Sequence, residues 1–455
     1  MHPARRPKLS LLRICEMNAG FFGLQFSFGL QQANMSPIYR TLGASEASLP
    51  LLWLAGPATG LLVQPLIGAM SDRTRSRMGR RTSYFLIGAV LCSLCLLAMP
   101  HSPALWAAAA LLWLLDAGNN VTMEPYRAYI ADRLSPEQQA TGFLTQSAFT
   151  GLAQTLAYLA PSLLAFMIDR ELLGPNGIPV IVRAAFTIGA VLSVSTIVWS
   201  ILRVPELPLA PQEHAAIAGK SFRPRALLRE VVQALNEMPR PMRRMIPAML
   251  CQWYAMFVYW QYITEAIARS LFDTASPATP AYRAATLAAQ ELGALYNTVA
   301  FLGALALIPL VRRLGARKVH VACLAASGLA MLLIPAAPSI AVLAFLMLGV
   351  GLGWAGMMAN PYVMLAEAIP HDRVGVYMGI FNILIVIPML IETLTVPLLY
   401  NPLLASDPRA ALILAGIFML AGAGATWFVG PSRLPHEGTR ERYSDAPLPP
   451  RDSNC

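Results

Sequence analysis

Long runs without any charged side chain recur along the chain. Asp, Glu, Lys and Arg are absent from residues 47–71, 82–115, 138–168, 245–264 and 319–366. Each run equals or exceeds the roughly 20 residues that a helix needs to cross the hydrocarbon core of a bilayer. Prolines interrupt the two longest runs where a short turn between two helices is expected: Pro100, Pro103, Pro335 and Pro338. The pattern predicts a helical protein that crosses a membrane many times.

The runs and their flanks predict twelve transmembrane helices in two sets of six, hence an all-α membrane protein. The first six are expected near residues 10–39, 47–70, 82–100, 104–132, 139–168 and 183–203, and the second six near 244–271, 285–311, 318–335, 338–369, 373–400 and 408–430. The corresponding domains are an N-terminal bundle (1–203), a linker (204–243) and a C-terminal bundle (244–430). Residues 225–237 have the spacing of an amphipathic helix lying on a membrane surface, and the tail, 431–455, is expected to be disordered.

The two sets of helices resemble copies of each other. The fourth helix carries Glu124-Pro125-Tyr126 and then Ala131-Asp132, whereas the tenth carries Asn360-Pro361-Tyr362 and then Ala366-Glu367. The second and eighth helices both end in Pro-Leu before a basic loop, at Pro65-Leu66 and Pro309-Leu310. Parallel repeats with a solute site between them, near the middle of the bilayer, are an architecture of membrane transporters.

Charge supports this interpretation and fixes an expected orientation. Of the 455 residues, 56% are apolar and only 13% charged, against roughly 25% charged in a soluble domain. The formal net charge of +10 gathers in loops that alternate with nearly uncharged ones, so the positive-inside rule places both termini in the cytoplasm. We therefore expect a multi-pass protein of the cytoplasmic membrane, surrounded by lipid, that binds no nucleic acid. The six cysteines are interpreted as core residues, and no metal or cofactor is expected.

The loop after the second helix carries a recognisable motif. Its elements are Gly68, Asp72 and Arg73, followed by Gly79, Arg80 and Arg81. It resembles the loop signature of the major facilitator superfamily, which implies a gating role for these residues. Asp132, at the same end of the fourth helix, is the expected partner of the arginines. The alternative is that the arginines only set the topology.

A narrower resemblance covers most of both halves. Gln25-Phe26, Leu30-Gln31, the segment from Leu115 to Asn120, Pro125-Tyr126-Arg127-Ala128 and the helix-11 residues Phe381-Asn382 and Ile385 to Pro388 are similar to the sucrose and maltose proton symporters of the glycoside-pentoside-hexuronide group. The chain departs from that family at Met389, where glutamine is preferred, and at Glu124, where plant members have a small residue. The resemblance implies proton-coupled symport of a disaccharide or related glycoside by alternating access, and transport roles for Asp116 and Arg127.

The fourth helix holds three charges at membrane depth, namely Asp116, Glu124 and Arg127. Charges there cost several kcal/mol, so they are candidates for function. Asp116 lies roughly 20 Å from the outer end of its helix and has no base within four residues. Because removal from water favours a neutral carboxyl, Asp116 is our expected proton carrier. Glu124 and Arg127 are three residues apart and are expected to form an ion pair. Sodium coupling is the rival, but the second helix supplies no acid to coordinate the ion.

A sugar site needs amide and hydroxyl groups for hydrogen bonding and an aromatic surface for stacking. The candidates for contact with a sugar are Gln25, Gln31, Asn119, Asn120, Gln146, Gln252, Trp260, Tyr262, Asn297, Asn360 and Asn382. We expect a monomer. The same helices would also suit a carrier of drugs, nucleosides or peptidoglycan fragments, and a polytopic glycosyltransferase or a sensor is a further alternative. The identity of the sugar and the role of Glu392, another acid at membrane depth, stay open.

Overall fold

The structure is a computed structural model that describes residues 7–71, 74, 76, 78–207, 238–366 and 374–429. Helices of this part of the chain form twelve long segments. The first six are α1 (Leu11–Thr41), α2 and α3 together (Leu49–Leu52 and Ala55–Ser71), α4 (Thr82–Ala98), α5 (Leu105–Arg133), α6 (Pro136–Leu164) and α7 (Val180–Arg203). The second six are α10 (Arg240–Leu271), α11 (Pro280–Leu314), α12 (Ala316–Leu333), α13 (Ile340–Ala366), α14 (Val374–Tyr400) and α15 (Pro408–Trp427). The predicted all-α fold with twelve segments is confirmed.

The ends of the helices differ from the predicted ones by a few residues. The helix expected from 244 begins at Arg240, inside the predicted linker, and the helix expected over 285–311 spans Pro280–Leu314. Charge-free runs underestimate such helices because their last turns lie beyond the hydrocarbon, where charged side chains cost little. The second segment is interrupted at Trp53 and Leu54, which form a turn between α2 and α3. The amphipathic part of the linker, 225–237, and the tail, 431–455, lie outside the described residues.

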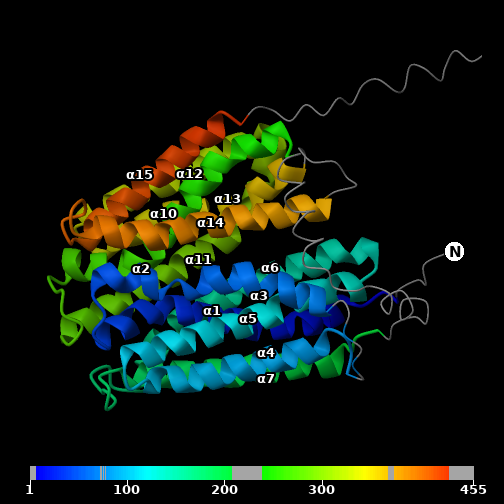
Figure 1. The fold of residues 1–455 in the computed structure, drawn as a ribbon, viewed down its shortest axis with the longest axis horizontal. Coiled ribbons are helices and arrows are strands. Elements are labelled where there is room, and N and C mark those ends of the chain that lie inside the picture. The colour runs from blue at the N-terminus through cyan, green and yellow to red at the C-terminus, as the bar shows by residue number, and fades with distance from the viewer. Residues whose placement is uncertain are drawn as a thin grey trace, which may run out of the picture.

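The two halves pack in the same way, as the duplicated sequence predicts. In the first bundle, α1 packs on α6 and α7, α4 on α5 and α7, and α3 on α5. In the second bundle, the corresponding pairs are α10 with α14 and α15, α12 with α13 and α15, and α11 with α13. Figure 1 shows the two bundles side by side, the first coloured blue to green and the second green to red. The bundles meet mainly through α6 with α11 and through α14 with α2 and α3.

Eight of the described helical segments are long and apolar enough to cross a membrane by composition alone. The remaining four, α1, α5, α6 and α10, are more polar, and they carry buried amide and carboxyl side chains such as Gln31, Asp116, Gln146 and Glu265. A helix that turns polar groups away from lipid towards other helices can still span a membrane. The polar helices are therefore those on which a solute site is expected.

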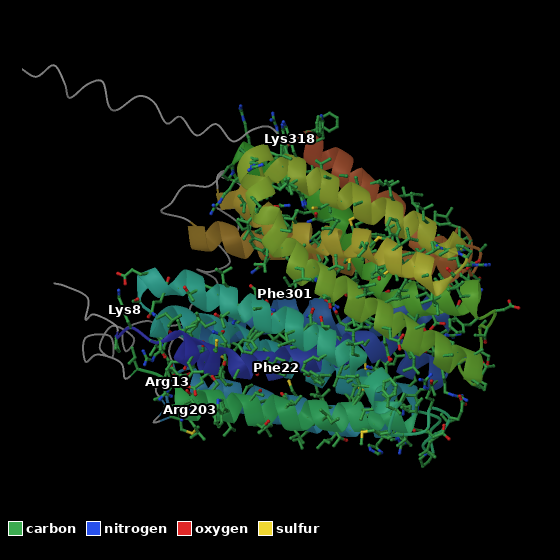
Figure 2. The ribbon with its side chains drawn as sticks, turned by 180° about the vertical axis from the view of Figure 1, so that it is seen from behind. Lys8, Arg13, Phe22, Arg203, Phe301 and Lys318 are labelled. Carbon is green, nitrogen blue, oxygen red and sulfur yellow. The ribbon has the colours of Figure 1, made fainter. Side chains whose placement is uncertain are left out.

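Basic side chains distinguish one end of the molecule from the other. Lys8, Arg13, Arg203 and Lys318 all lie towards one end in Figure 2, which we call the basic end. The other end, where α1 leads to the short helix Glu46–Ser48 and α14 leads to α15, is called the opposite end.

Glycines of α6 and α11 receive aromatic rings of the other helix. A Cβ atom on Gly151 of α6 would lie 2.9 Å from the Cβ of Phe301 of α11, and one on Gly293 of α11 would lie 2.3 Å from the ring of Tyr158 of α6. The two contacts are thus reciprocal, with one ring and one glycine on each helix. They hold the two bundles in register along this interface.

Glycines also let α4 and α5 approach closely. A Cβ on Gly88 would lie 2.1 Å from Oγ1 of Thr122 and 2.6 Å from the carbonyl oxygen of Gly118. We expect Gly88→Ala to destabilise the protein by about 1–3 kcal/mol, because two helices would have to separate to fit the methyl group. The check is the Tm of the purified protein. Gly424→Ala on α15, where no atom lies within 4 Å of the new methyl position, is the control and should leave the Tm unchanged.

Candidate functional site

Asp116 lies inside the first bundle near the middle of α5 and is only 1% exposed. Nε2 of Gln31, on α1, donates a hydrogen bond of 2.8 Å to Oδ1 of Asp116. Oδ2 is buried without a hydrogen-bond partner among the described residues, and it points towards Gly56 of α3, where a Cβ would lie 3.6 Å away. No described Lys, Arg or His forms an ion pair with this carboxyl. Asp116 is thus a buried carboxyl without a compensating charge in the described part of the chain.

Amide side chains surround Asp116 and connect three helices. Asn119 donates from Nδ2 to Oε1 of Gln31 at 3.4 Å, and its Oδ1 accepts from the thiol of Cys92 on α4. Asn120 donates to Oγ1 of Thr59 at 3.0 Å and accepts from Gln64 at 2.6 Å, both on α3. Asn119 therefore helps to orient Gln31, the residue that contacts Asp116, whereas Asn120 links α5 to α3.

Glu124 and Arg127 form the ion pair that their spacing predicts, with 3.2 Å between Arg127 Nη1 and Glu124 Oε1. The Arg127 side chain is 48% exposed and that of Glu124 is 27% exposed, so the pair is not sealed inside the bundle. Such exposure leaves Arg127 able to meet a solute while Glu124 neutralises its charge.

A pocket lies between the two bundles, beside α1. Its lining residues come from α1, α6, α10 and α11: Gln32, Ser36, Tyr158, Tyr259, Trp260, Thr264, Gln290 and Tyr296, with smaller apolar residues. Nε1 of Trp260 donates to the hydroxyl of Tyr296 at 3.1 Å. Two consecutive residues of α1 connect Asp116 with the pocket, since Gln31 contacts Asp116 and Gln32 lines the pocket. Aromatic faces with a few amides suit a sugar ring.

Gln290 of α11 connects the bundles at this pocket and was missed in the sequence analysis. Its Nε2 donates to Oδ1 of Asn34 at 2.9 Å and to the carbonyl of Ala33 at 3.2 Å, both on α1. Its Oε1 is buried with no partner in the described part of the chain. The sequence alone does not indicate a role for Gln290, because its partner, Asn34, lies 256 residues away.

The remaining sugar-contact candidates lie in different surroundings. Gln25 accepts from Gln154 of α6 at 3.1 Å, and Nδ2 of Asn297 donates to the carbonyl of Gly293 in its own helix. Gln252 bonds His320 of α12 at 2.9 Å, so it faces the interior of the second bundle rather than the pocket. Gln146 and Asn360 are buried, and the amide nitrogen of each has no partner among the described residues. Asn382 is exposed. The hydroxyl of Tyr262 donates to the backbone carbonyl of Glu46, at the opposite end.

The opposite end holds four charged residues and two tyrosines that we call the ionic cluster: Arg40, Glu46, Glu265, Arg269, Tyr282 and Tyr400. Glu46, of the first bundle, accepts from Arg269 of α10 at 2.9 and 2.7 Å and from Tyr400 of α14 at 2.6 Å. Arg40, also of the first bundle, lies 3.4 Å from Glu265 of α10, which accepts from Tyr282. The cluster binds the two bundles together at this end.

Sequence reasoning missed the ionic cluster. Glu46 lies in the short loop after the first predicted helix, and Glu265 directly follows the charge-free run 245–264. The available signal was Glu265 itself, because an acid inside a predicted transmembrane helix requires a partner at that depth.

The basic end shows the expected pairing of the motif arginines. Arg80 and Arg81 contact Oδ2 of Asp132 at 2.5 and 3.1 Å. Glu206, after α7, accepts from the backbone nitrogens of Arg81 and Thr82 at 3.0 and 3.2 Å and thereby caps the start of α4. Gly79 has a positive φ of 106° and forms the turn before these arginines. Gly68 lies in α3, whereas Asp72 and Arg73 lie outside the described residues. Within the described ranges no group of three or more His, Cys, Asp or Glu could hold a metal ion.

Comparison with known proteins places this geometry in a family. The model of the Major Facilitator Superfamily matches residues 17–271 and 248–451. A sucrose transport protein of Arabidopsis thaliana, SUC4, is 27% identical over 430 residues, covering 84% of this chain and 82% of that protein. A general alpha-glucoside permease of Schizosaccharomyces pombe is 26% identical, covering 57% of this chain and 49% of that protein. The crystal structure of the nucleoside transporter NupG superposes with a TM-score of 0.65 at 14% identity, covering 92% of this chain and 99% of that one, which shows a shared fold.

Proposed function

The chain belongs to the Major Facilitator Superfamily, and from this premise we propose that it imports a disaccharide or related glucoside together with a proton. The cargo is proposed from relatives whose names state sucrose transport and alpha-glucoside permeation. The aromatic and amide groups of the inter-bundle pocket suit such a cargo, because sugar rings stack on aromatic faces and their hydroxyls need hydrogen bonds. In this function the residues that line the pocket contact the sugar once the two bundles separate and widen it.

The observation that carries proton coupling is the carboxyl of Asp116, buried with one oxygen unpartnered and with no described cation against it. Burial without a compensating charge favours the neutral form of a carboxyl. A transport cycle then requires that this carboxyl releases its proton before it binds the next one. Gln31 ties Asp116 to α1, and the neighbouring Gln32 lines the pocket. A shift of α1 as the bundles move therefore changes the surroundings of the sugar and of the proton together. Release of both follows when water reaches them from one side.

The proposed orientation puts the basic end in the cytoplasm. Lys8, Arg13, Arg203 and Lys318 gather there, as the positive-inside rule requires for the cytoplasmic side of a membrane. The ionic cluster then lies at the outer face, where it closes the route to the pocket from outside. The structure in this interpretation corresponds to a carrier closed towards the outside.

Uptake into vesicles tests the function directly. Purified protein in liposomes is given labelled sucrose, maltose or trehalose under an inward proton gradient, with and without a proton ionophore. We expect one of these glucosides to accumulate above its outside concentration, and the ionophore to abolish the accumulation. Accumulation driven instead by a sodium gradient would reject proton coupling, and absence of uptake for all three sugars would reject the proposed cargo.

Trp260 offers a separate test of the pocket. We expect Trp260→Ala to raise the KM for the transported sugar at least about tenfold, the equivalent of ~1.4 kcal/mol of lost binding, because the ring would no longer stack on the sugar. Trp106, on α5, is 74% exposed and lies outside the pocket, so Trp106→Ala is the matched control and should keep the wild-type KM. Equal KM values for the two variants would place the sugar elsewhere.

A further inference from the structure

Glu392 is a second buried carboxyl, and the mechanism above does not use it. It lies about two turns before the end of α14 at Tyr400 and is 0% exposed. Nε2 of Gln261, on α10, donates to its Oε2 at 3.2 Å. Helices α10 and α14 pack along each other in the second bundle (Figure 1).

Two oxygen atoms of this pair are left without partners. Oε1 of Glu392 and Oε1 of Gln261 are both buried, and neither has a hydrogen-bond partner among the residues that the structure describes. An amide oxygen and an ionised carboxylate can only accept hydrogen bonds, so two such acceptors cannot satisfy each other. Unpartnered polar atoms in an apolar environment cost about 1–3 kcal/mol each.

One proton supplies the missing hydrogen-bond donor. A protonated carboxyl has an O–H donor, and an amide offers both an acceptor and a donor. With a proton bound to Oε1 of Glu392, the pair can form a cyclic acid–amide dimer in which Gln261 donates through Nε2 and accepts through Oε1. The reaction is the addition of one proton to the carboxylate, with formation of an O–H bond and loss of one negative charge.

No described Lys, Arg or His forms an ion pair with Glu392 that could take the place of this proton. From α10, Tyr254 and Tyr262 face the region, and Tyr254 shares its hydroxyl with Thr395. Arg40 and Arg269 belong to the ionic cluster, where they contact Glu46 and Glu265. Glu46, from the short helix before α2, is itself paired with Arg269, and neither α2 nor α3 carries a titratable side chain. An ionised Glu392 would thus face no described base, at a depth where an uncompensated charge costs several kcal/mol.

The first bundle contains a matching arrangement. Gln31 and Gln261 lie at nearly the same position along α1 and α10, the first helices of the two bundles, and each donates its amide to a buried carboxyl. The carboxyls are Asp116 and Glu392, and each keeps one oxygen unpartnered. We propose that Glu392 is a proton-binding site of the second bundle, occupied in this conformation through an acid–amide pair with Gln261.

The placement of Glu392 gives the bound proton a conformational role. α14 packs against α2 and α3 of the first bundle, and Tyr400, two turns further along α14, bonds Glu46 in the ionic cluster. The proton on Glu392 is therefore stable while α14 stays packed, and it is released when the bundles separate and water enters. This role rests on the proposed transport function, whereas proton binding itself does not.

Infrared spectroscopy of the purified protein at neutral pH tests the proposal without any transported solute. The carbonyl-stretch absorption of protonated carboxyls should fall in Glu392→Gln by the amount of one carboxyl relative to the wild type. Glu137, at the start of α6, is 70% exposed and pairs with Lys8, so Glu137→Gln is the matched control and should leave the absorption unchanged. Gln261→Leu should retain the band of Glu392 but shift its frequency, because the amide partner is gone.

The outcomes separate this site from the transport function. An absorption that is equal in the wild type and Glu392→Gln would overturn the proposal, even if sugar uptake is observed. An absorption that falls by the amount of one carboxyl in Glu392→Gln would support it, even if none of the tested sugars is carried. If Glu392→Gln cannot be purified as a folded protein, the frequency shift in Gln261→Leu decides the question, and an unshifted band would reject the acid–amide pair.

Discussion

Asp116→Asn should abolish accumulation of sugar against its gradient while leaving exchange of sugar across the membrane intact. Asparagine has the shape of aspartate and can keep the hydrogen bond from Gln31, but it cannot bind and release a proton. Without coupling free energy between proton and sugar, the steady-state ratio of inside to outside sugar should fall to about 1. The measurement is uptake into liposomes under an inward proton gradient, followed by counterflow with preloaded sugar.

The control for this variant is another aspartate changed in the same way. Asp169 is exposed in the segment between α6 and α7 and is remote in the chain from the polar groups around Asp116, so Asp169→Asn should accumulate sugar like the wild type. If Asp116→Asn still concentrates sugar, the proton is carried elsewhere, and Glu392 becomes the first candidate. If both accumulation and counterflow are lost, Asp116 is required for sugar binding or for movement of the bundles rather than for coupling alone.

Glu46→Gln should shift the protein towards a conformation that is open at the opposite end. The Glu46 carboxylate accepts from Arg269 and Tyr400, both in the second bundle, and the Glu46 side chain is only 7% exposed. Hydrogen bonds to a charged group contribute about 1.5–3 kcal/mol each, so loss of one such contribution should change the ratio of open to closed forms roughly 10- to 150-fold. Spin labels on cysteines at Ser45 and Leu403, in a background without native cysteines, report the distance between the bundles.

A second ion pair between the bundles supplies the control. Glu171 contacts Arg283 of α11 at the same end, but the Glu171 side chain is 53% exposed. Exposed ion pairs contribute about 0–1 kcal/mol, so Glu171→Gln should change the distance distribution little. Equal distributions for Glu46→Gln and the wild type would show that the ionic cluster does not hold this end closed.

The fold follows from the sequence to a large extent because lipid imposes a simple rule on it. A charge-free run of sufficient length has to be a helix, since only helices and closed barrels satisfy their own backbone groups in a membrane. Local spacing also predicts the pair of Glu124 and Arg127, whose members are one helical turn apart. The contact of Arg80 with Asp132 was expected because both lie at the basic ends of their helices.

The contacts between bundles were beyond sequence reasoning. Glu46 and Arg269 are 223 residues apart, and no periodicity relates two positions on separate bundles. Gln252 illustrates the same limit, because the sequence shows an amide in a polar helix but not the direction in which it points. In the structure it meets His320 inside its own bundle. Burial of Asp116 was expected from depth, but its contact with Gln31 depends on how α1 and α5 are rotated.

The reciprocal contacts of α6 and α11 limit how the halves of the carrier can move. Tyr158 lies against Gly293 and Phe301 against Gly151, so a translation of one helix along the other would have to lift both rings over larger neighbours. A rocking movement about the line through the two contacts leaves both rings where they are. The conformations that load and unload the sugar then differ only in the sign of the rocking angle between the two bundles. The empty carrier has to return through the same rotation.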